Sequence, residues 1–212
     1  QTNKEMTLFA AELEKRGVDA FDITGGWHES RVPQVPMDLP RGAFVYLAQG
    51  VKKAVSKPVI ACNRINDPEL ANKVIQQGRA DMVGLARGLL ADPQFPNKVQ
   101  QGRAEEITLC IGCNQGCLDN SLRHRAVECM VNPRTGKELE IHRDGKAISE
   151  KKVIVIGGGV GGLTAAKEAA RIGHQVILYE KGTQLGGQLL VAGAAAGREE
   201  FRVYVKRLAL QA

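Results

Sequence analysis

A strand, a glycine-rich loop, a helix and a second strand constrain the fold of this chain more than any other feature. Residues 151–181 read KKVIVIGGGVGGLTAAKEAARIGHQVILYEK, in which Gly157, Gly159 and Gly162 match the pattern G-x-G-x-x-G. Such glycines permit a tight turn and let the backbone approach a pyrophosphate at the helix N-terminus. The unit therefore predicts the start of a Rossmann-like α/β domain that binds a dinucleotide, rather than an ordinary glycine-rich turn.

Further residues are candidate contacts of that dinucleotide. Gly161 lies in the same loop, and Glu180 ends the second strand, where a carboxylate accepts hydrogen bonds from ribose hydroxyls. The loop itself does not distinguish NAD from FAD. The later segment QLGGQLL, which contains Gln188, resembles the second flavin-contacting segment of the glutathione-reductase type of flavoprotein. This resemblance favours FAD.

The first part of the chain alternates between helical and strand patterns. In one of its helical patterns, Asp67 is a candidate N-cap, Pro68 follows at the first helical position, and Gly78 ends the pattern. The strand patterns cover 18–24, 58–64 and 80–87, and the helical ones 4–16, 41–55, 67–78 and 88–104. This alternation predicts parallel strands covered by helices. It is too short to close a (β/α)8 TIM barrel, which takes ~250 residues, but it suits the C-terminal part of one.

We expect three parts along the chain. Residues 1–105 are the barrel portion, residues 106–150 hold the cysteines and a polar linker, and residues 151–212 begin the nucleotide-binding domain. The chain has no starting methionine and opens within a helical pattern, which we interpret as a fragment of a longer protein.

Four cysteines gather between the two α/β parts. Cys110, Cys113, Cys117 and Cys129 have the spacing C-x2-C-x3-C-x11-C, which suits tetrahedral zinc, two disulfides or a [4Fe–4S] cluster. Structural zinc sites usually use two separate C-x2-C pairs, whereas here three thiols share one loop, so the spacing favours the cluster. The remaining cysteine, Cys62, lies in an apolar strand pattern and is expected to be a small core residue.

Composition narrows these alternatives. The N-terminal residues lack the apolar core of a signal peptide, and no apolar run approaches the ~18 residues of a membrane span. We therefore expect a cytoplasmic protein without a membrane partner, in which thiols stay reduced and disulfides are excluded. The net charge is +6, but the basic residues are scattered and aromatic residues amount to 4%, so a nucleic-acid partner is not expected.

The combination of these parts resembles one family, the multidomain relatives of old yellow enzyme (NADH:flavin oxidoreductases). Among these, the bacterial 2,4-dienoyl-CoA reductases are the most similar, and the resemblance covers essentially the whole chain. The segments that carry it are GWHESRVP, PRGAF, NRINDP, ADMVGLAR, CIGCNQGCLD, CMVNP and GREEF.

This resemblance implies FMN in the barrel, a [4Fe–4S] cluster beside it, and FAD and NAD(P)H in the C-terminal domains. Arg64 in NRIND and Ala86, Arg87 and Gly88 in GLARG match positions that hold FMN, and Arg198 in GREEF is among the implied cofactor-binding residues. Both FMN segments follow strand patterns, at the end of a barrel where phosphate sites form.

The resemblance also implies the substrate site. His28 matches an active-site histidine near the substrate carbonyl, which assists a tyrosine upstream of this chain, and His28, Glu29, Ser30 and Arg31 match the thioester-contacting segment. Ser30 departs from the alanine usual in dienoyl-CoA reductases.

The implied function is reduction of a C=C bond in an unsaturated acyl-CoA by an NAD(P)H-dependent ene-reductase. Electrons would pass from NAD(P)H to FAD, to [4Fe–4S], to FMN and to the substrate. Three alternatives stay open: an aromatic acyl-CoA ring reductase of the naphthoyl-CoA type, an enzyme resembling trimethylamine dehydrogenase, and a non-catalytic electron-transfer or zinc-stabilised FAD module.

Overall fold

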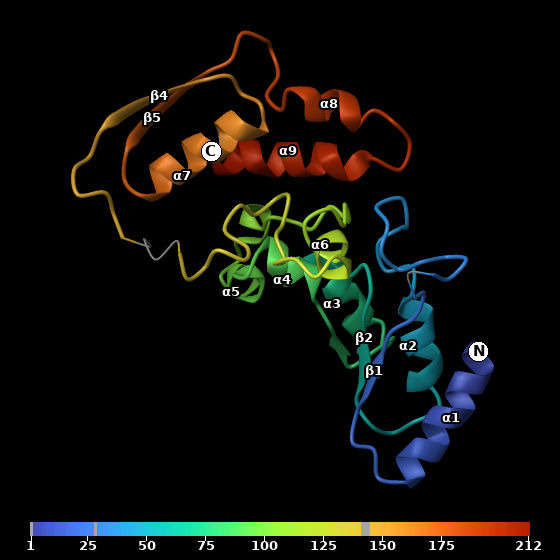
Figure 1. Cartoon of the computed structure of the whole chain (residues 1–212). Coiled ribbons are helices and arrows are strands. Elements are labelled where there is room, and N and C mark those ends of the chain that lie inside the picture. Colours follow the sequence, from blue (N-terminus) through green and yellow to red (C-terminus); the bar gives the residue numbers. More distant parts are fainter. Residues whose placement is uncertain (1, 28, 141–144) are drawn as a thin grey trace. The chain divides into compact units, whose positions relative to one another are not determined.

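The computed structural model describes residues 2–27, 29–140 and 145–212. The described chain has an α/β fold and divides into two compact units. The first ends at Leu89 and the second begins at Leu90. Each unit contains its own parallel sheet (Figure 1).

The sheet of the first unit contains three short parallel strands. They are β1 (Phe21–Ile23), β2 (Val59–Ala61) and β3 (Met82–Val83), paired in that order. Helix α1 (Asn3–Lys15) precedes β1, and the helices that separate the strands are α2 (Val45–Lys52) and α3 (Pro68–Gln76). The expected alternation of strands and helices is therefore confirmed, with strands shorter than their sequence patterns.

Local sequence signals set the bounds of these helices. The Thr2 side chain accepts a hydrogen bond from the Glu5 amide, and the Glu5 carboxylate accepts one from the Thr2 amide, which together form a capping box for α1. Asp67 caps α3 as predicted, by accepting hydrogen bonds from the Glu69 and Leu70 amides. Each cap satisfies amides that have no partner within the helix.

The core of the first unit lies between the sheet and its helices. Val45 and Val51 of α2 pack with Val59 and Ala61 of β2, and all four are at most 1% exposed. Because a buried aliphatic side chain stabilises the fold by about 1.5–3 kcal/mol, this contact fixes α2 on the sheet. The carboxyl ends of the strands are thereby held in register.

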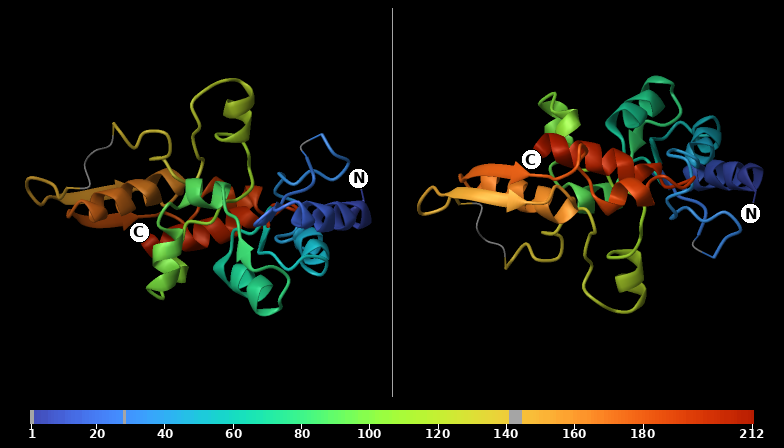
Figure 2. Two further views of the ribbon diagram at one scale, coloured as in Figure 1. Left: turned by 90° about the horizontal axis from the view of Figure 1, so that it is seen from below. Right: turned by 90° about the horizontal axis from the view of Figure 1, so that it is seen from above.

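The second unit contains the strand–loop–helix–strand unit predicted from the glycine motif. β4 (Lys152–Ile156) and β5 (Gln175–Tyr179) pair in parallel, and α7 (Val160–Arg171) connects them. α8 (Gln188–Ala192) and α9 (Glu199–Gln211) follow, and Figure 2 shows α9 running beside α7. The predicted Rossmann-like beginning is confirmed.

The pattern at 88–104, which we expected to be helical throughout, is interrupted. It forms α4 (Arg87–Ala91), α5 (Phe95–Gln100) and the 3-10 turn η1 (Ala104–Glu106). Asp92 accepts a hydrogen bond from the Gln94 amide, and Pro93 cannot donate to the preceding helical turn. The chain therefore turns between α4 and α5, and this turn becomes important for the cysteine segment.

The cysteine segment contains one short helix, α6 (Leu118–Leu122), between long irregular stretches. The loop that carries α6 projects from the helices of its own unit in both views of Figure 2. The residues described between α6 and β4 form no helix or strand.

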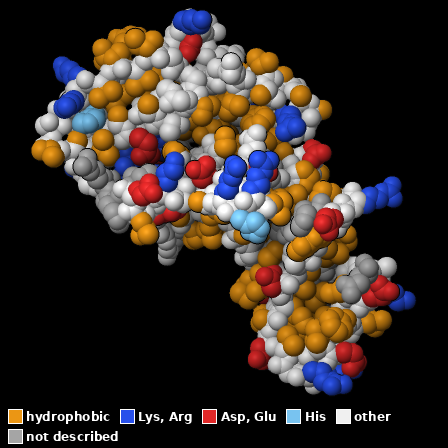
Figure 3. Space-filling model, in the orientation of Figure 1, with side chains coloured by type: hydrophobic (Ala, Val, Ile, Leu, Met, Phe, Trp, Pro, Cys, Tyr) orange, Lys and Arg blue, Asp and Glu red, His pale blue; other side chains and the backbone are white. Residues whose placement is uncertain are grey.

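Two features of the surface are its mixed charge and an exposed apolar face of the β4–β5 sheet. On the face drawn in Figure 3, Lys and Arg side chains are interspersed with Asp and Glu. One face of the β4–β5 sheet is apolar and exposed, with Ile156 87% and Tyr179 59% accessible. In the described part of the chain, every helix is too short or too polar to cross a bilayer.

Candidate functional site

The glycine loop between β4 and α7 is shaped by two of its glycines. Gly157 has φ +102°, a left-handed conformation that side chains disfavour. At Gly162 a Cβ would lie 1.9 Å from the Gly157 carbonyl oxygen, so a side chain there is excluded. These two glycines are therefore required by the turn itself.

Gly159 and Gly161 are different, because a Cβ at either would meet no atom of the described residues within 4 Å. Gly159 is the N-cap of α7 and has an ordinary φ of −72°. Nothing in the chain's own packing requires glycine there, so the open space above the helix N-terminus fits an approaching pyrophosphate. The loop thus has the features needed to hold a dinucleotide.

Glu180 closes the glycine loop. Its carboxylate accepts hydrogen bonds from the amides of Gly158 at 2.6 Å and Gly182 at 2.8 Å. The Gly182 amide first, and then the Gly158 amide, hold the pKa of this carboxyl below its usual range. Glu180 is therefore an ionised residue of the loop, a role in addition to the predicted contact with ribose.

The segment expected to contact a flavin lies against the glycine loop. The Gly186 amide donates to the Gly158 carbonyl at 2.7 Å, and Gly159 and Gly186 form a β-bridge. Gln188, which begins α8, is exposed just beyond this contact. Arg198 is also exposed, at the N-cap of α9.

The predicted FMN end of the first unit is formed by the loops after β2 and β3. Asn63 and Arg64 follow β2 after Cys62, and both have left-handed backbones, with φ of 73° and 54°. Such strain in consecutive non-glycine residues is typical of functional turns. The Asn63 side chain accepts from Thr24 Oγ1 at 3.2 Å and donates to the Gly25 carbonyl at 3.2 Å.

Both predicted arginines hold one loop. Arg64, which is buried, donates to the carbonyls of Leu39 at 3.1 Å and Met37 at 3.2 Å. Arg87 donates to the Val35 carbonyl at 2.8 Å. A guanidinium carries five donors in a planar fork, a geometry that suits a phosphate as well as backbone carbonyls. The two cations at adjacent strand ends fit the phosphate of FMN and also fix residues 34–39.

Two further predicted FMN contacts flank Arg87. Ala86 is exposed, whereas Gly88 is buried, with the Leu85 side chain 3.2 Å from where its Cβ would be. Close packing at Gly88 keeps the start of α4 near the end of β3.

The predicted substrate segment follows β1. Glu29, Ser30 and Arg31 are exposed, and the Ser30 amide donates to the Trp27 carbonyl at 2.9 Å. His28, the predicted catalytic residue, lies outside the described residues. The loop 34–39, held by the two arginines, continues directly from this segment.

The four cysteines of the second unit are outside any disulfide bond and are partly exposed. Backbone amides point at their sulfurs: the Gly112 amide lies 3.5 Å from Cys110 Sγ, and the Gln115 amide bonds Cys113. Burial raises the pKa of Cys113, and the nearby Cys110 and Cys117 raise it further.

No three His, Cys, Asp or Glu side chains of the described residues gather closely enough to hold a metal ion. A [4Fe–4S] cube binds its cysteines at separate corners, and amide hydrogen bonds to sulfur tune such clusters. The donor set of four thiols with amides directed at them fits an iron–sulfur cluster.

Cys62, the cysteine outside this segment, is only partly buried. Its thiol donates a hydrogen bond to the Asp22 carboxylate at 2.7 Å. Burial, followed by this carboxylate, raises the pKa of Cys62 to about 12. The thiol is therefore protonated at neutral pH and is a polar contact between β1 and the end of β2, more than a simple core residue.

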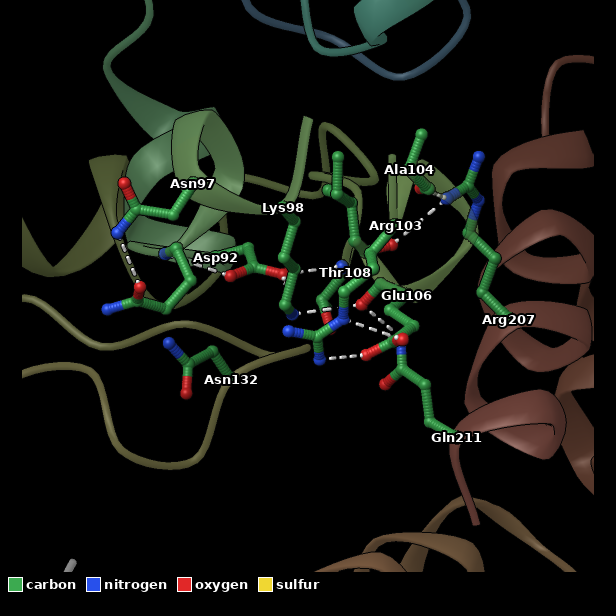
Figure 4. Close-up of polar contacts among 12 residues, drawn as sticks. Asp92, Asn97, Lys98, Arg103, Ala104, Glu106, Thr108, Asn132, Arg207 and Gln211 are labelled. Atoms are coloured by element: carbon green, nitrogen blue, oxygen red, sulfur yellow. Dashed lines mark hydrogen bonds and ion pairs between the residues drawn. The ribbon is translucent and has the colours of Figure 1, made fainter. Parts of the chain in front are cut away.

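The α4–α5 turn anchors both ends of the cysteine segment, which the sequence patterns did not predict. The Asp92 carboxylate accepts a hydrogen bond from the Thr108 amide at 2.9 Å, two residues before Cys110 (Figure 4). At the other end, the side chains of Asn132 and Thr135 donate to the Leu90 carbonyl at 2.9 and 2.7 Å. The signal available in the sequence was Asp92 followed by Pro93 inside a helical pattern, which indicates a turn with a carboxylate at its start.

Two family models match the chain. Residues 2–106 match the NADH:flavin oxidoreductase / NADH oxidase family, and residues 155–203 match an NAD(P)-binding Rossmann-like domain. The first match contains the strand-end arginines, and the second contains the whole glycine loop.

Similar proteins share the order of the parts. The chain is 50% identical over 94% of its length to a metal reductase of Desulforamulus reducens, and 38% identical over 92% of its length to a cinnamate reductase of Clostridium sporogenes. It covers 30% and 29% of these relatives.

Among solved structures, a complex of 2-naphthoyl-CoA reductase with 2-naphthoyl-CoA has a TM-score of 0.95 and 34% identity. That match covers 100% of this chain and 32% of the reductase chain. The chain is therefore similar to about a third of a longer flavoenzyme, with both α/β parts and the segment between them included. By these matches and by the geometry of the strand ends and the glycine loop, residues 2–106 belong to the NADH:flavin oxidoreductase / NADH oxidase family, and residues 155–203 belong to an NAD(P)-binding Rossmann-like domain.

Proposed function

We propose that this chain is part of an NAD(P)H-dependent flavin and iron–sulfur ene-reductase, which reduces a C=C bond of an α,β-unsaturated or dienoyl acyl-CoA thioester. The observation that carries the proposal is the likeness of the whole chain, at a TM-score of 0.95, to a reductase solved with an acyl-CoA thioester. The family match and the cinnamate reductase relative support reduction of a conjugated C=C bond.

The chain's parts would hold three cofactors, in the parts 1–105, 106–150 and 151–212. Arg64, Ala86, Arg87 and Gly88 would hold FMN, the four cysteines would hold a [4Fe–4S] cluster, and the glycine loop with Glu180, Gln188 and Arg198 would hold FAD. When bound, the flavins supply hydride chemistry and the cluster supplies single-electron transfer between them. The free thiols suit a reducing compartment such as the cytoplasm.

The chain's own residues would bind and orient. The guanidinium groups of Arg64 and Arg87 would neutralise a flavin phosphate while they hold residues 34–39 by the carbonyls of that loop. The dipole of α7 and the open space at Gly159 would receive the FAD pyrophosphate.

We further propose that His28 lies at the substrate carbonyl and assists proton donation there. Glu29, Ser30 and Arg31 would contact the thioester, and their exposure in this structure leaves them accessible to a ligand. A histidine suits this role because its ordinary pKa is close to neutrality.

A second candidate is reduction of an aromatic ring in an acyl-CoA, because 2-naphthoyl-CoA is the ligand of the similar structure. Oxidation of an amine is a third, since the chain is also similar to a histamine dehydrogenase from Rhizobium, with a TM-score of 0.88 and 29% identity. The thioester-type segment that follows β1 favours the reductases over the amine dehydrogenases.

Anaerobic turnover by the whole protein tests the proposal. NAD(P)H oxidation should depend on a dienoyl or enoyl thioester, and the protein should contain about four iron and four sulfide per chain. Turnover of 2-naphthoyl-CoA alone would select the second candidate, and turnover of amines alone would select the third. One zinc without sulfide, and turnover of none of these, would favour a zinc-stabilised FAD module.

A further inference from the structure

The backbone immediately before Cys110 is held by side chains from elsewhere in the second unit. In η1 and the residue after it, the carbonyls of Ala104, Glu106 and Ile107 all accept side-chain hydrogen bonds. Ile107 and Leu109 are buried, with exposures of 0% and 2%. The entry into the cysteine segment is therefore a fixed part of the structure.

The last two turns of α9 supply most of these donors. Arg207 Nη1 donates to the carbonyls of Ala104 at 2.7 Å and Ile107 at 3.2 Å, and Gln211 Nε2 donates to the Glu106 carbonyl at 2.8 Å. Figure 4 shows both side chains reaching from α9 toward the 104–107 backbone. These contacts join residues about 100 positions apart in the chain.

The same network reaches the helix that begins at the glycine loop. Lys167 of α7 donates to Gln211 Oε1 at 2.7 Å, so the Gln211 amide joins α7 to the Glu106 carbonyl. Lys98 of α5 donates to that carbonyl as well, at 2.9 Å, and to Asp92 at 2.7 Å. The Glu106 carbonyl, four residues before Cys110, thus accepts hydrogen bonds from α5 and from α9.

From this arrangement we propose that Arg207 and Gln211 are positioning residues, which fix the cysteine segment relative to the dinucleotide loop. Hydrogen bonds between α9 and residues 104–107, and not the polar linker before β4, set the placement of the thiols against α7. If the cysteines hold a cluster and the glycine loop holds FAD, as in the proposed function, these contacts keep the two cofactors at a constant separation. This consequence rests on the proposed function. A charged donor that bonds two carbonyls is suited to this because such bonds are stronger than neutral ones.

Hydrogen exchange on the whole holoprotein tests the arrangement directly. The variant Arg207→Met/Gln211→Leu should increase amide exchange of residues 104–110 by about tenfold or more, since lost bonds to charged donors destabilise local structure. Lys206→Met, at an exposed position of the same helix, is the matched control and should leave this exchange unchanged. Arg207→Lys with Gln211 intact should restore much of the protection.

The rate of cluster reduction distinguishes a positioning role of Arg207 and Gln211 from a contribution to folding stability alone. In the double variant, reduction of the cluster by NAD(P)H should slow several-fold, while its direct reduction by dithionite should keep the control rate. Exchange equal to that of Lys206→Met would overturn the proposal, as would equal slowing with both reductants. If the whole protein contained no iron and sulfide, the proposed function would fail, but the exchange result would still decide whether α9 holds residues 104–107. If the double variant does not fold, Lys167→Met removes the outer link alone and should raise exchange at Glu106.

Discussion

The carboxylate of Asp92 accepts a hydrogen bond from the backbone amide of Thr108 at 2.9 Å, and this bond links the α4–α5 turn to the residues that lead into the cysteine segment. Asp92 is 5% exposed and also receives the Lys98 ammonium at 2.7 Å. One buried carboxylate therefore satisfies a buried amide and a largely buried cation together.

Asp92→Ala should lower the free energy of unfolding of the second unit by about 3 kcal/mol, because it leaves the Lys98 cation without its carboxylate partner and the Thr108 amide without its acceptor. Scanning calorimetry of the holoprotein measures the change. The comparison is Glu12→Ala, which breaks the ion pair with Lys15 at 2.6 Å on the surface of α1. Since such exposed pairs contribute less than about 1 kcal/mol, a similar shift for both variants would contradict the assigned role of Asp92.

Gly159 and Gly162 should respond differently to alanine. In Gly162→Ala the new Cβ would lie 1.9 Å from the Gly157 carbonyl, so the loop cannot close and both folding and FAD binding should suffer. In Gly159→Ala the methyl group enters open space, so the fold should persist while FAD affinity falls at least about tenfold.

Circular dichroism and FAD titration of the two variants separate these effects. Retained FAD affinity in a folded Gly159→Ala protein would show that the pyrophosphate does not lie over the N-cap of α7.

Arg87→Met should loosen residues 34–39 and lower the FMN content, because it removes the hydrogen bond to the Val35 carbonyl and a cation from the β3 end. Limited proteolysis within 34–39 and the flavin-to-protein ratio are the measurements. Arg79→Met, which removes a contact with the Gln49 side chain at 3.3 Å, is the control. Full FMN content together with unchanged proteolysis would exclude both functions of Arg87.

Acid release of FAD should depend on Glu180. Because its pKa is lowered by the Gly182 and Gly158 amides, Glu180 stabilises the folded loop at pH values above the ordinary glutamate pKa of about 4.3. That contribution is lost as the pH falls through the lowered pKa. Glu180→Gln should therefore bind FAD more weakly at neutral pH and show a smaller additional loss on acidification.

Flavin fluorescence during titration from neutral to acid pH follows the release. Glu150→Gln, an exposed residue just before β4, should titrate like the unaltered protein. Identical acid profiles for Glu180→Gln and the unaltered protein would rule out this carboxylate as the titrating group.

Local signals predicted what local interactions determine. Asp67, Pro68 and Gly78 marked α3 because an N-cap, a fixed φ and a left-handed C-terminal residue act within one helical turn. The glycine loop was predictable for the same reason, since its spacing and flanking strands specify the turn.

Contacts between distant residues could not be predicted in this way. The hydrogen bonds from α9 to residues 104–107 join elements about 100 residues apart, and no pattern in one sequence reports such pairing. The helical pattern at 88–104 was misleading because Asp92 and Pro93 stop the helix, although the apolar spacing continues beyond them. The predicted cofactor-binding residues all lie within the described part of the chain, while their roles stay predictions; His28, the predicted catalytic residue, lies outside it.

At the left-handed turn formed by Asn63 and Arg64, a change that raises thermal stability would loosen the loop that carries the predicted substrate segment. Glycine at position 63 would relieve the left-handed backbone strain, although asparagine bears less than the roughly 1–2 kcal/mol of other side chains, so selection for heat resistance would favour it. The same change would delete the amide that joins Thr24 to Gly25 and thereby loosen the base of the loop that carries the substrate segment. Thermostable variants of this protein should therefore gain their stability at other positions and keep a side chain here.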